Sequence, residues 1–596
     1  MPTRTACGPA SESLAPRPAP HVPMRLFLTL LATAFFSLSA RAQVGVLVTE
    51  SPDLSPLGYT SDYGSTVAGI GDAQDSGNAD ILVGQPLPHA VAAYLRDGRT
   101  GAVLHKFTSL HGGPSTVNRF GSAVAALPDV TGDGRDDLLI AGYKESITGG
   151  GATGRVYVYG RPLPGGTPTL LHELTPPSGS NLYNFGWDVE GMPDVDGDGF
   201  GEVLVGQPGA QYSSVQYDGH AFLYSGKTGA LLRTFSHPDT SLPSTRSFGE
   251  SVAVVPDVDG DGLDDVAVAA PSVPDLWGTY VNQGVSVFSS ASGALIRKLD
   301  PVDPYVGDWG RGLAGIEDLN GDGRGELLVG HPSGIGRVHV YSVIDGVELG
   351  TLSSLVPDAV ADKRFGTSVS GAGDANGDGV ADILVGAPGE WNGGFQRGRA
   401  YAFSGADFSL LSVLEVPQHY APGQGWTSRL GQAVELMPDA NGDGKAEYLV
   451  GAPNLVVPGT PNGVTLTYFC ETESLSSVTV ELGSPANPDV LGWLGHPILG
   501  ETLQVQIDHA SFAPAAVADV VLVAAAGASL PLPGGTLLVD PAALLLVRVA
   551  APGAPVDLAL PALCDLAGIP LLVQGASLVG SDFLATNALV VRLGTQ

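Results

Sequence analysis

The chain has 596 residues, of which 43% are hydrophobic, and its mean hydropathy is +0.18. This length exceeds what one ordinary core fills, so we expect a large domain and at least one more. Only 15% of the residues are charged, and 61 acidic side chains outnumber 28 Lys and Arg, for a formal net charge of -33. A surface this acidic repels nucleic acid and anionic membranes, which argues against partners of either kind.

The N-terminus has the features of an export signal. Residues 1–23 are rich in Pro and Ala, and a basic start at Met24-Arg25 then opens a short apolar run that ends in A-x-A at Ala42. This order is typical of a secretory signal peptide. We expect residues 1–42 to be a signal region, with Met24 as the true start and cleavage after Ala42. A transmembrane anchor is the weaker interpretation because the run is shorter than the ~20 residues that a span needs.

Three cysteines are present, and Cys7 falls in the segment that we expect to be absent from the mature protein. An oxidising compartment would permit a disulfide between Cys470 and Cys564. Two buried free thiols fit equally well, because spacing alone does not decide pairing.

An aromatic-Gly pair recurs every 56 to 65 residues. The seven copies are Tyr63-Gly64, Phe120-Gly121, Phe185-Gly186, Phe248-Gly249, Trp309-Gly310, Phe365-Gly366 and Leu430-Gly431, the last with Leu in place of the aromatic residue. Each unit continues with four short apolar or alternating segments separated by Gly, Asp and Pro turns, and none has a helical period. Seven such units predict an all-β, seven-bladed β-propeller. A calcium-binding β-helix needs a much shorter repeat, whereas an open solenoid of β-units is the serious rival.

Six of the seven units contain an acidic nonapeptide between their first two strands. The copies are DVTGDGRDD, DVDGDGFGE, DVDGDGLDD, DLNGDGRGE, DANGDGVAD and DANGDGKAE. Oxygen-bearing side chains stand at positions 1, 3, 5 and 9, and Gly at position 6, where Gly262 for example would adopt a positive φ. Calcium accepts flexible coordination by oxygen ligands alone, whereas magnesium requires a stricter octahedral geometry.

We expect each loop to bind calcium through the side chains at positions 1, 3, 5 and 9 and the backbone carbonyl at position 7. These residues are Asp129, Thr131, Asp133, Arg135 and Asp137; Asp194, Asp196, Asp198, Phe200 and Glu202; Asp257, Asp259, Asp261, Leu263 and Asp265; Asp318, Asn320, Asp322, Arg324 and Glu326; Asp374, Asn376, Asp378, Val380 and Asp382; and Asp439, Asn441, Asp443, Lys445 and Glu447. Thr131 should weaken the first of these sites. The loop at Asp72 has Gln74 and Ser76 at positions 3 and 5, so we expect it to bind no ion, and the total to be five to six calcium ions.

Two other interpretations of the nonapeptides are less favoured. EF-hand and dockerin loops require flanking helices and a glutamate at position 12, whereas strands are expected here. Asp-Gly pairs also occur in turns that bind no ion. That interpretation explains a single copy of the nonapeptide better than it explains six copies. For the aromatic-Gly pairs the structural interpretation is preferred, and we expect them to be core anchors rather than ligand contacts.

The repeat resembles a known family. Gly386-Ala387-Pro388 and Gly451-Ala452-Pro453 follow the acidic loops, and together with the aromatic-Gly pairs they match the FG-GAP repeat, similar to the propeller of integrin alpha subunits. The resemblance covers residues ~45 to ~480 and implies a seven-bladed ring with calcium between the first two strands of a blade. It also implies that an N-terminal strand completes the last blade. Residues 44–50 fit that role, with residues 472–482 as a competitor. We therefore expect the propeller to span residues 43–482.

From residue 483 to residue 596 the acidic loops stop, and Val, Leu, Ala and Pro dominate. Seven short apolar segments separated by turn residues predict a small C-terminal β-sandwich. The uncharged stretch between Val520 and Val539 contains Pro531 and Pro533, which favours a strand-turn-strand over a membrane span. This tail resembles small β-domains that end many large secreted bacterial repeat proteins, and this implies a bacterial, secreted or cell-surface protein.

No catalytic motif of the metalloprotease, nucleophile-elbow, P-loop or Rossmann type occurs. We therefore predict no enzymatic activity. The resemblance to FG-GAP propellers implies an adhesion or recognition module for an extracellular protein or glycan, in which we expect calcium to be mainly structural. The loops at 145–154 and 389–398 are the candidate recognition surface. A passive extracellular scaffold is the alternative, and a propeller hydrolase or lyase with a loop-built site is a less favoured one.

Overall fold

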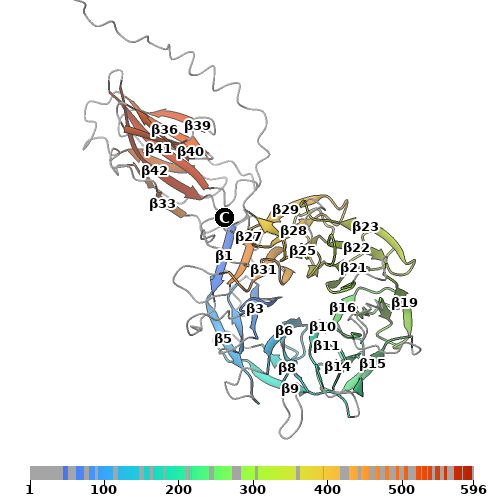
Figure 1. Cartoon of the computed structure of the whole chain (residues 1–596). Helices are drawn as coiled ribbons and strands as arrows, with labels where there is room; N and C mark the ends of the chain where they lie inside the picture. Colours follow the sequence, from blue (N-terminus) through green and yellow to red (C-terminus); the bar gives the residue numbers. More distant parts are fainter. Residues whose placement is uncertain are drawn as a thin grey trace, which may run out of the picture.

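The computed structural model describes residues 45–50, 62–72, 79–86, 91–98, 100–111, 118–145, 153–161, 166–178, 183–209, 211–212, 215–216, 218–239, 247–271, 284–301, 307–356, 363–392, 395–416, 428–439, 445–455 and 464–469, and ten strands from residue 477 onward. Every regular element in these ranges is a β-strand. The four-stranded sheets up to residue 469 are arranged around a ring, as Figure 1 shows. The all-β propeller that the sequence predicts is therefore confirmed.

The first three blades are antiparallel sheets whose strands follow chain order from the inside of the ring to the outside. Blade 1 contains β2 (Thr66–Ile70), β3 (Asp80–Gln85), β4 (Ala92–Arg96) and β5 (Val103–Thr108). Blade 2 contains β6 (Phe120–Leu127), β7 (Asp137–Gly142), β8 (Arg155–Gly160) and β9 (Thr169–Leu174). Blade 3 contains β10 (Asp188–Met192), β11 (Glu202–Gln207), β14 (His220–Ser225) and β15 (Leu231–Ser236), with the hairpin β12 (Gln211–Tyr212) and β13 (Val215–Gln216) inserted after β11.

The next three blades repeat this plan. Blade 4 contains β16 (Ser251–Val255), β17 (Asp265–Ala269), β18 (Val285–Phe288) and β19 (Leu295–Leu299). Blade 5 contains β20 (Leu313–Ile316), β21 (Glu326–His331), β22 (Arg337–Ser342) and β23 (Val347–Leu352). Blade 6 contains β24 (Val369–Ser370), β25 (Ile383–Ala387), β28 (Arg399–Phe403) and β29 (Leu410–Leu414), with the hairpin β26 (Trp391–Asn392) and β27 (Phe395–Gln396) inserted after β25.

One further four-stranded sheet combines the two ends of this region, and we call it the composite sheet. It contains β30 (Val434–Met437), β31 (Glu447–Ala452), β32 (Val464–Phe469) and β1 (Gly45–Glu50). The register pairs Gly45 with Phe469 and Glu50 with Val464, so the N-terminal strand lies antiparallel to β32 in the outermost position. The role expected for residues 44–50 is therefore observed as strand pairing, whereas the competing segment pairs elsewhere.

Seven hydrophobic clusters fill the spaces between neighbouring sheets. Two of them involve the composite sheet: Met437 and Leu449 pack with residues of blade 1, and Leu436 and Tyr448 pack with residues of blade 6. The second and third strands of each blade are mainly apolar, such as DLLIAG and RVYVYG in blade 2, and they are buried because another sheet lies against each face. The fold is thus stabilised by sheet-on-sheet burial all around the ring.

The repeated glycines form the joint between blades. The aromatic residue of each pair is fully buried, as expected of a core anchor, and the following Gly has a positive φ. A methyl group added to Gly84 would overlap the carbonyl oxygen of Gly121 in the next blade, and the same holds for Gly386 against Gly431. Only glycine permits this close backbone approach. The two halves of the repeat motif, which are distant in the sequence of one unit, therefore meet between units.

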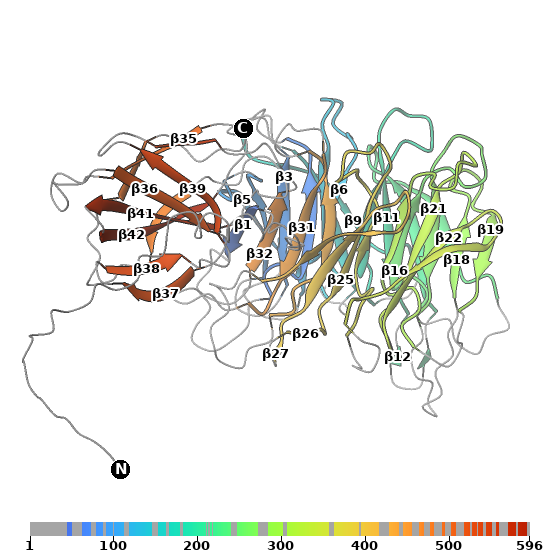
Figure 2. The same ribbon diagram turned by 90° about the horizontal axis from the view of Figure 1, so that it is seen from above.

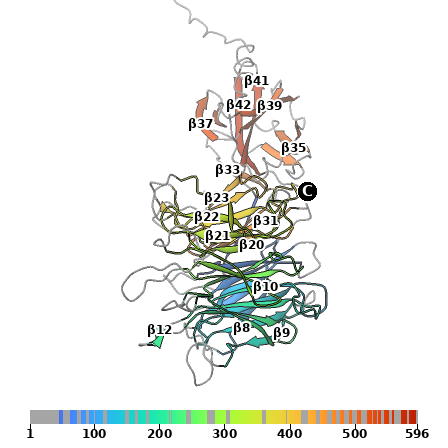
Figure 3. The same cartoon turned by 90° about the vertical axis from the view of Figure 1, so that its right-hand side faces the viewer.

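The strands after residue 477 form separate sheets outside the ring (Figure 3). A five-stranded sheet has the order β33 (Ser477–Glu481), β42 (Asp582–Arg592), β41 (Pro570–Val579), β36 (Ala518–Ala524) and β39 (Leu544–Ala550). A three-stranded sheet contains β34 (Leu491–Leu494), β35 (Thr502–Ile507) and β40 (Val556–Ala559), and a two-stranded sheet contains β37 (Gly527–Leu532) and β38 (Gly535–Val539). By its pairing with β42, β33 belongs to these C-terminal sheets.

Among the residues that the structure describes, no helix has the length and apolar character to cross a membrane. The expected signal region and all three cysteines lie outside the described residues.

Candidate metal sites

The acidic nonapeptides connect the innermost strand of a blade to its second strand. We number them by blade: loop 1 (72–80), loop 2 (129–137), loop 3 (194–202), loop 4 (257–265), loop 5 (318–326), loop 6 (374–382) and, in the composite sheet, loop 7 (439–447). Because every innermost strand runs in the same direction around the ring, these turns lie at one end of the propeller, and the loops after the second strands lie at the other. The hairpins β12–β13 and β26–β27 project at that other end (Figure 2).

In loops 2 to 6, backbone N–H groups of the turn donate to the carboxylate of the first Asp. In loop 5, Asp318 Oδ1 accepts from the backbone N–H of Gly321 at 2.6 Å and Oδ2 from Gly323 at 2.6 Å. The glycines at positions 4 and 6 both have positive φ in loops 2 to 6, for example 82° at Gly321 and at Gly323. The sequence predicted a positive φ for the glycine at position 6. It did not predict one for the glycine at position 4, although the G-D-G triplet of these loops contains both glycines.

The carboxylate at position 9 begins the second strand and is buried. In loop 4, Asp265 Oδ2 accepts from the backbone N–H of Val258 at 2.9 Å, and Oδ1 accepts from Ser290 of the same blade at 3.2 Å. Loops 2, 3, 5 and 6 repeat the first of these bonds, with Glu326 accepting from Leu319 at 2.7 Å in loop 5. Position 9 therefore ties the loop to the blade while its carboxylate stays at the base of the turn.

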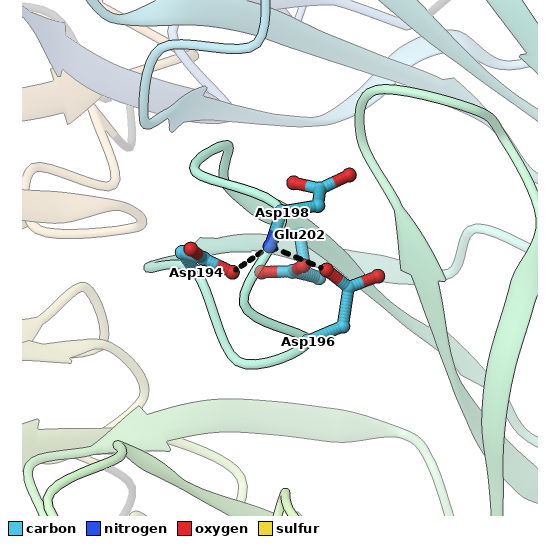
Figure 4. A group of neighbouring side chains, drawn as sticks. All are labelled: Asp194, Asp196, Asp198 and Glu202. Carbon is cyan, nitrogen blue, oxygen red and sulfur yellow. Dashed lines mark hydrogen bonds between the residues drawn. The ribbon is translucent and has the colours of Figure 1, made fainter.

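Three loops bring acidic oxygens together closely enough to share one ion. In loop 3, oxygens of Asp194, Asp196, Asp198 and Glu202 all lie within 4.8 Å of one another, and Figure 4 shows these side chains around the turn. The same limit holds for Asp257, Asp259 and Asp265 in loop 4, and for Asp318, Asp322 and Glu326 in loop 5.

In loops 5 and 6 an asparagine occupies position 3 between two carboxylates. Asn320 Nδ2 donates to Asp322 Oδ2 at 3.0 Å and to Glu326 Oε1 at 2.6 Å. Asn376 Nδ2 donates to Asp378 Oδ2 at 2.9 Å and to Asp382 Oδ1 at 3.2 Å. These two loops thus bring the side chains expected at positions 3, 5 and 9 into one group.

Loop 2 is the copy with Thr at position 3. Thr131 Oγ1 donates to Asp129 Oδ1 at 3.3 Å. Burial, with smaller contributions from the charges of Asp133 and Asp129, raises the pKa of Asp137 to about 6. At position 7, the backbone N–H of Arg135 donates to Asp133 Oδ1 at 3.1 Å, an arrangement that Phe200, Leu263, Arg324 and Val380 repeat in the next four loops.

Loops 1 and 7 are described only in part. Gln74 and Ser76 of loop 1, and Asn441 and Asp443 of loop 7, lie outside the described residues. The position 9 residues of both loops are buried, and Asp80 Oδ1 accepts from the backbone N–H of Gly98 at 3.2 Å. Loop 1 therefore keeps a structural bond of position 9, and the expectation that it binds no ion stays a prediction.

The electrostatics of the loops favour a bound cation. Burial, together with the charges of Asp196, Asp194 and Asp198, raises the pKa of Glu202 to about 8. Burial likewise raises the pKa of Asp265 to about 7 and that of Glu326 to about 7. A carboxylate that resists ionisation among other carboxylates is stabilised in its charged form by a nearby positive ion.

The donor set also fits calcium. Glu202 Oε1 is buried and accepts no hydrogen bond from any described residue, although a buried carboxylate oxygen is costly without a partner. The donors are carboxylate, amide, hydroxyl and carbonyl oxygens, with neither Cys nor His among them. Such a set suits a hard cation with flexible coordination, which is calcium rather than zinc.

The fold and these loops are those of a β-propeller in which several units are similar to FG-GAP repeats. The FG-GAP repeat family matches residues 120–159, 248–288 and 365–403, which are the first three strands of blades 2, 4 and 6. The expected resemblance to FG-GAP repeats is therefore confirmed.

Known proteins with similar sequences are integrin alpha chains. The chain is 29% identical over 315 residues to integrin alpha pat-2 of Caenorhabditis briggsae, which covers 48% of this chain and 22% of the relative. It is 34% identical over 164 residues to integrin alpha-4 of Xenopus laevis, covering 27% and 15%, and 33% identical over 167 residues to human integrin alpha-IIb, covering 26% and 15%. The chain thus matches less than a quarter of the length of these relatives, and what it shares with them is an integrin-like β-propeller.

Proposed function

We propose that this chain is an exported, calcium-binding β-propeller that acts as an adhesion or recognition module for an extracellular protein or glycan. The observation that carries the proposal is the grouping of a buried position 9 carboxylate with more exposed carboxylates in repeated loops at one end of an integrin-like propeller. We assign contacts with a partner to the other end, where the hairpins β12–β13 and β26–β27 project (Figure 2).

Calcium would be held by the side chains at positions 1, 3, 5 and 9 and the carbonyl at position 7 of loops 2 to 7. Its chemistry there is charge neutralisation, which removes the repulsion among carboxylates such as those around Glu202. Ions that bind only the folded blade stabilise it by mass action. The role of calcium is therefore structural, and five to six ions are expected. Extracellular calcium sites bind with Kd of about 10⁻⁴–10⁻³ M, which suits permanent occupation outside cells.

We further propose that the composite sheet is a seventh blade that closes the ring. In support, Ser370 of blade 6 accepts at Oγ from the backbone N–H of Leu436 at 3.0 Å. On the other side, a Cβ added to Gly451 would overlap the carbonyl oxygen of Gly64 in blade 1, which is the joint seen between other blades. An open solenoid has no contact between its first and last units, so this joint favours the closed ring over that rival.

The domain limits follow from the same proposal. The propeller would begin at residue 43, after removal of a signal region that starts at Met24, and would end between β32 and β33. This end lies slightly before the expected residue 482, because β33 pairs with β42. The C-terminal strands would then form the expected β-sandwich, of a kind found in secreted bacterial proteins.

The recognition surface would be the end of the ring that carries the inserted hairpins. Trp391, in the hairpin of blade 6, is 54% exposed, which is unusual for the largest apolar side chain. Exposed aromatic side chains on rigidly anchored loops are common contact residues for proteins and glycans. The loop expected at 389–398 is thus partly described, whereas most of the loop at 145–154 lies outside the described residues.

The test is binding of the purified chain to glycan and extracellular-protein arrays, in calcium and again in chelator. Saturable binding that Trp391→Ala weakens at least about tenfold supports the proposal, since exposed anchors carry much of an interface's energy. A folded, calcium-loaded chain that binds nothing contradicts it and favours the passive scaffold. Turnover of a glycan or ester panel would instead support the propeller enzyme.

A further inference from the structure

The calcium loops fall into two alternating classes. Position 9 is Asp in loops 2, 4 and 6, and Glu in loops 3, 5 and 7. Position 8 is Gly or Ala in the Glu class, at Gly201, Gly325 and Ala446. The FG-GAP family matches fall on blades 2, 4 and 6, which carry the Asp class. The two classes are therefore defined by position 9 alone, because Ala381 of loop 6 shows that a small residue at position 8 also occurs in the Asp class.

Each Glu-class loop donates a backbone hydrogen bond to the loop of the preceding blade. Gly201 N donates to the carbonyl oxygen of Asp129 at 3.3 Å. Ala446 N donates to that of Asp374 at 2.9 Å, and Gly325 N donates to that of Pro256, directly before loop 4, at 3.0 Å. All three bonds start at position 8, where a small residue allows the close approach.

The side chain at position 7 adds a second contact across the same boundary. Arg324 Nη1 donates to the carbonyl oxygen of Val258 at 2.8 Å, and its guanidinium lies directly against Gly260 of loop 4. A Cβ built on Gly132 of loop 2 would lie 3.5 Å from the ring of Phe200, and one built on Gly377 of loop 6 would lie 3.0 Å from Lys445 Cε. In every case the residue at position 7 covers the position 4 glycine of the preceding loop.

The alternate boundaries lack these contacts. A Cβ built on Gly197 of loop 3, or on Gly321 of loop 5, would meet no atom within 4 Å, so Leu263 and Val380 do not cover them. Within the described part of the chain, no hydrogen bond joins residues 194–202 to residues 257–265. Loops 3 and 4 are therefore neighbours that share apolar packing through Val195 but no hydrogen bond between described residues.

We propose that the calcium loops act as three coupled pairs, 2–3, 4–5 and 6–7, in which the Glu-class loop positions the loop before it so that an ion at one site favours an ion at the other. The inference rests on the proposed calcium binding. Arg324, Phe200 and Lys445 are positioning residues: the backbone carbonyl of each would bind the ion of its own loop, while its side chain holds the preceding loop.

The physical reason for the coupling is that an ion in one loop also orders the backbone of the loop before it. An ion in loop 5 would fix residues 324–326, and with them the two groups that hold Pro256 and Val258 of loop 4. Val258 N in turn donates to Asp265 Oδ2, a ligand of the second site. An ion in loop 4 then has less backbone left to order, which is positive coupling. The positive charge of Arg324 lowers the affinity of loop 4 for a cation. The quantity to measure is therefore the change in the affinity of loop 4 when loop 5 loses its ion, and not the affinity of loop 4 itself.

The experiment uses the full-length chain with Leu263→Trp, which places a sensitising indole at position 7 of loop 4. Terbium luminescence excited through this indole, corrected for the unsubstituted chain, reports the ion affinity of loop 4. The titration is repeated with Asp322→Asn in the coupled loop 5 and with the matched Asp198→Asn in the uncoupled loop 3. We expect Asp322→Asn to weaken loop 4 by at least about fivefold and Asp198→Asn by less than about twofold. With Arg324→Ala added, the effect of Asp322→Asn should shrink, as a mutant cycle would show.

Equal effects of Asp322→Asn and Asp198→Asn, with terbium bound, would overturn the pairing and leave the calcium assignment standing. No terbium signal from a chain with an unchanged circular dichroism spectrum would overturn the calcium assignment itself, and the pairing with it. A second reporter, Val380→Trp in loop 6, guards against a misfolded first variant. It should respond to Glu447→Gln in loop 7 and stay unchanged with Asp322→Asn in loop 5, and the reverse result would contradict the pairing.

Discussion

Tyr401 Oη donates to Glu390 Oε2 at 2.6 Å in the interior of blade 6, where both side chains are fully buried. Arg399 Nη1 approaches the same carboxylate oxygen at 3.3 Å, and the backbone carbonyl of Glu390 accepts from Gly398 N at 3.0 Å. Glu390 therefore closes the base of the hairpin that presents Trp391. Blade 2 repeats the arrangement, with Tyr157 Oη donating to Glu145 at the base of the other candidate recognition loop.

Replacing Tyr401 by Phe should destabilise the chain by about 1.5–3 kcal/mol, since hydrogen bonds to charged groups contribute this much and the carboxylate stays buried. Urea unfolding in calcium measures the change. Tyr341→Phe is the matched control, because Tyr341 is buried in blade 5 and its hydroxyl makes no hydrogen bond to a described residue. Equal losses in the two variants would show that the Glu390 bond contributes no stability.

The glycine joint between blades gives a second prediction. Gly386→Ala should cost about 3 kcal/mol, because the added methyl group meets the Gly431 carbonyl and Ser368 Oγ, and neither can move without separating two blades. Gly293→Ala is the control, since this turn glycine has a φ of 74° and an added Cβ would meet only Arg233 Cδ, at an ordinary contact distance of 3.6 Å. Only the backbone cost of about 1 kcal/mol then applies. A smaller loss at Gly386 than at Gly293 would mean that the joint is loose.

Removing the charge of Glu202 should have opposite effects with and without calcium. Glu202→Gln keeps the shape of the side chain but loses a ligand charge, so one ion fewer should bind and the melting temperature in calcium should fall. In chelator, folding at neutral pH requires Glu202 to take up a proton, because burial and the charges of Asp196, Asp194 and Asp198 raise its pKa to about 8. Gln removes this cost, so the melting temperature should rise. Equilibrium dialysis and calorimetry measure both effects. A loss of stability in both solutions would indicate that Glu202 acts only as a hydrogen-bond acceptor for Val195.

The innermost strands carry carboxylates outside the calcium loops that give stability a pH dependence. Asp188 Oδ2 accepts from Val252 N of the next blade at 3.0 Å, and burial raises the pKa of Asp188 to about 6. Burial also raises the pKa of Glu435, in β30, to about 8. The folded chain then holds protons that the unfolded chain releases, so stability should fall as the pH rises from about 4 to about 8.

Unfolding in saturating calcium across this pH range measures the slope. Glu435→Gln should flatten it above pH 6, where Asp188 is already ionised, whereas Asp345→Asn at an exposed position should leave it unchanged. A slope above pH 6 that Glu435→Gln does not alter would assign the titration to another group.

The sequence predicted the repeat architecture because the motif recurs, and recurrence separates a structural requirement from chance. Tyr63, Phe120 and Trp309 were expected to be core anchors, and all three are fully buried. The same pattern did not reveal that Gly84 of one unit meets Gly121 of the next, because an alignment of units shows what is equivalent and not what is in contact. The role of Arg324 was missed for the same reason: as a position 7 residue only its carbonyl seemed relevant, and its side chain acts on a different loop.

One signal for the paired loops was present in the sequence, since Asp and Glu alternate at position 9 from loop 2 to loop 7. The chemical similarity of the two residues hides the distinction, because both supply a carboxylate. The structure separates them: the second oxygen of Asp265 accepts from Ser290, whereas Glu202 Oε1 stays without a partner among the described residues.

The most direct test of the account is calorimetric unfolding of the full-length chain in calcium and in chelator, combined with a count of bound ions by equilibrium dialysis. We predict five to six bound calcium ions and a melting temperature that rises with calcium concentration, with about 2.7 kcal/mol gained per site at a hundredfold excess over Kd. A chain that binds no calcium and unfolds at the same temperature in both solutions would contradict the assignment of these loops as structural calcium sites.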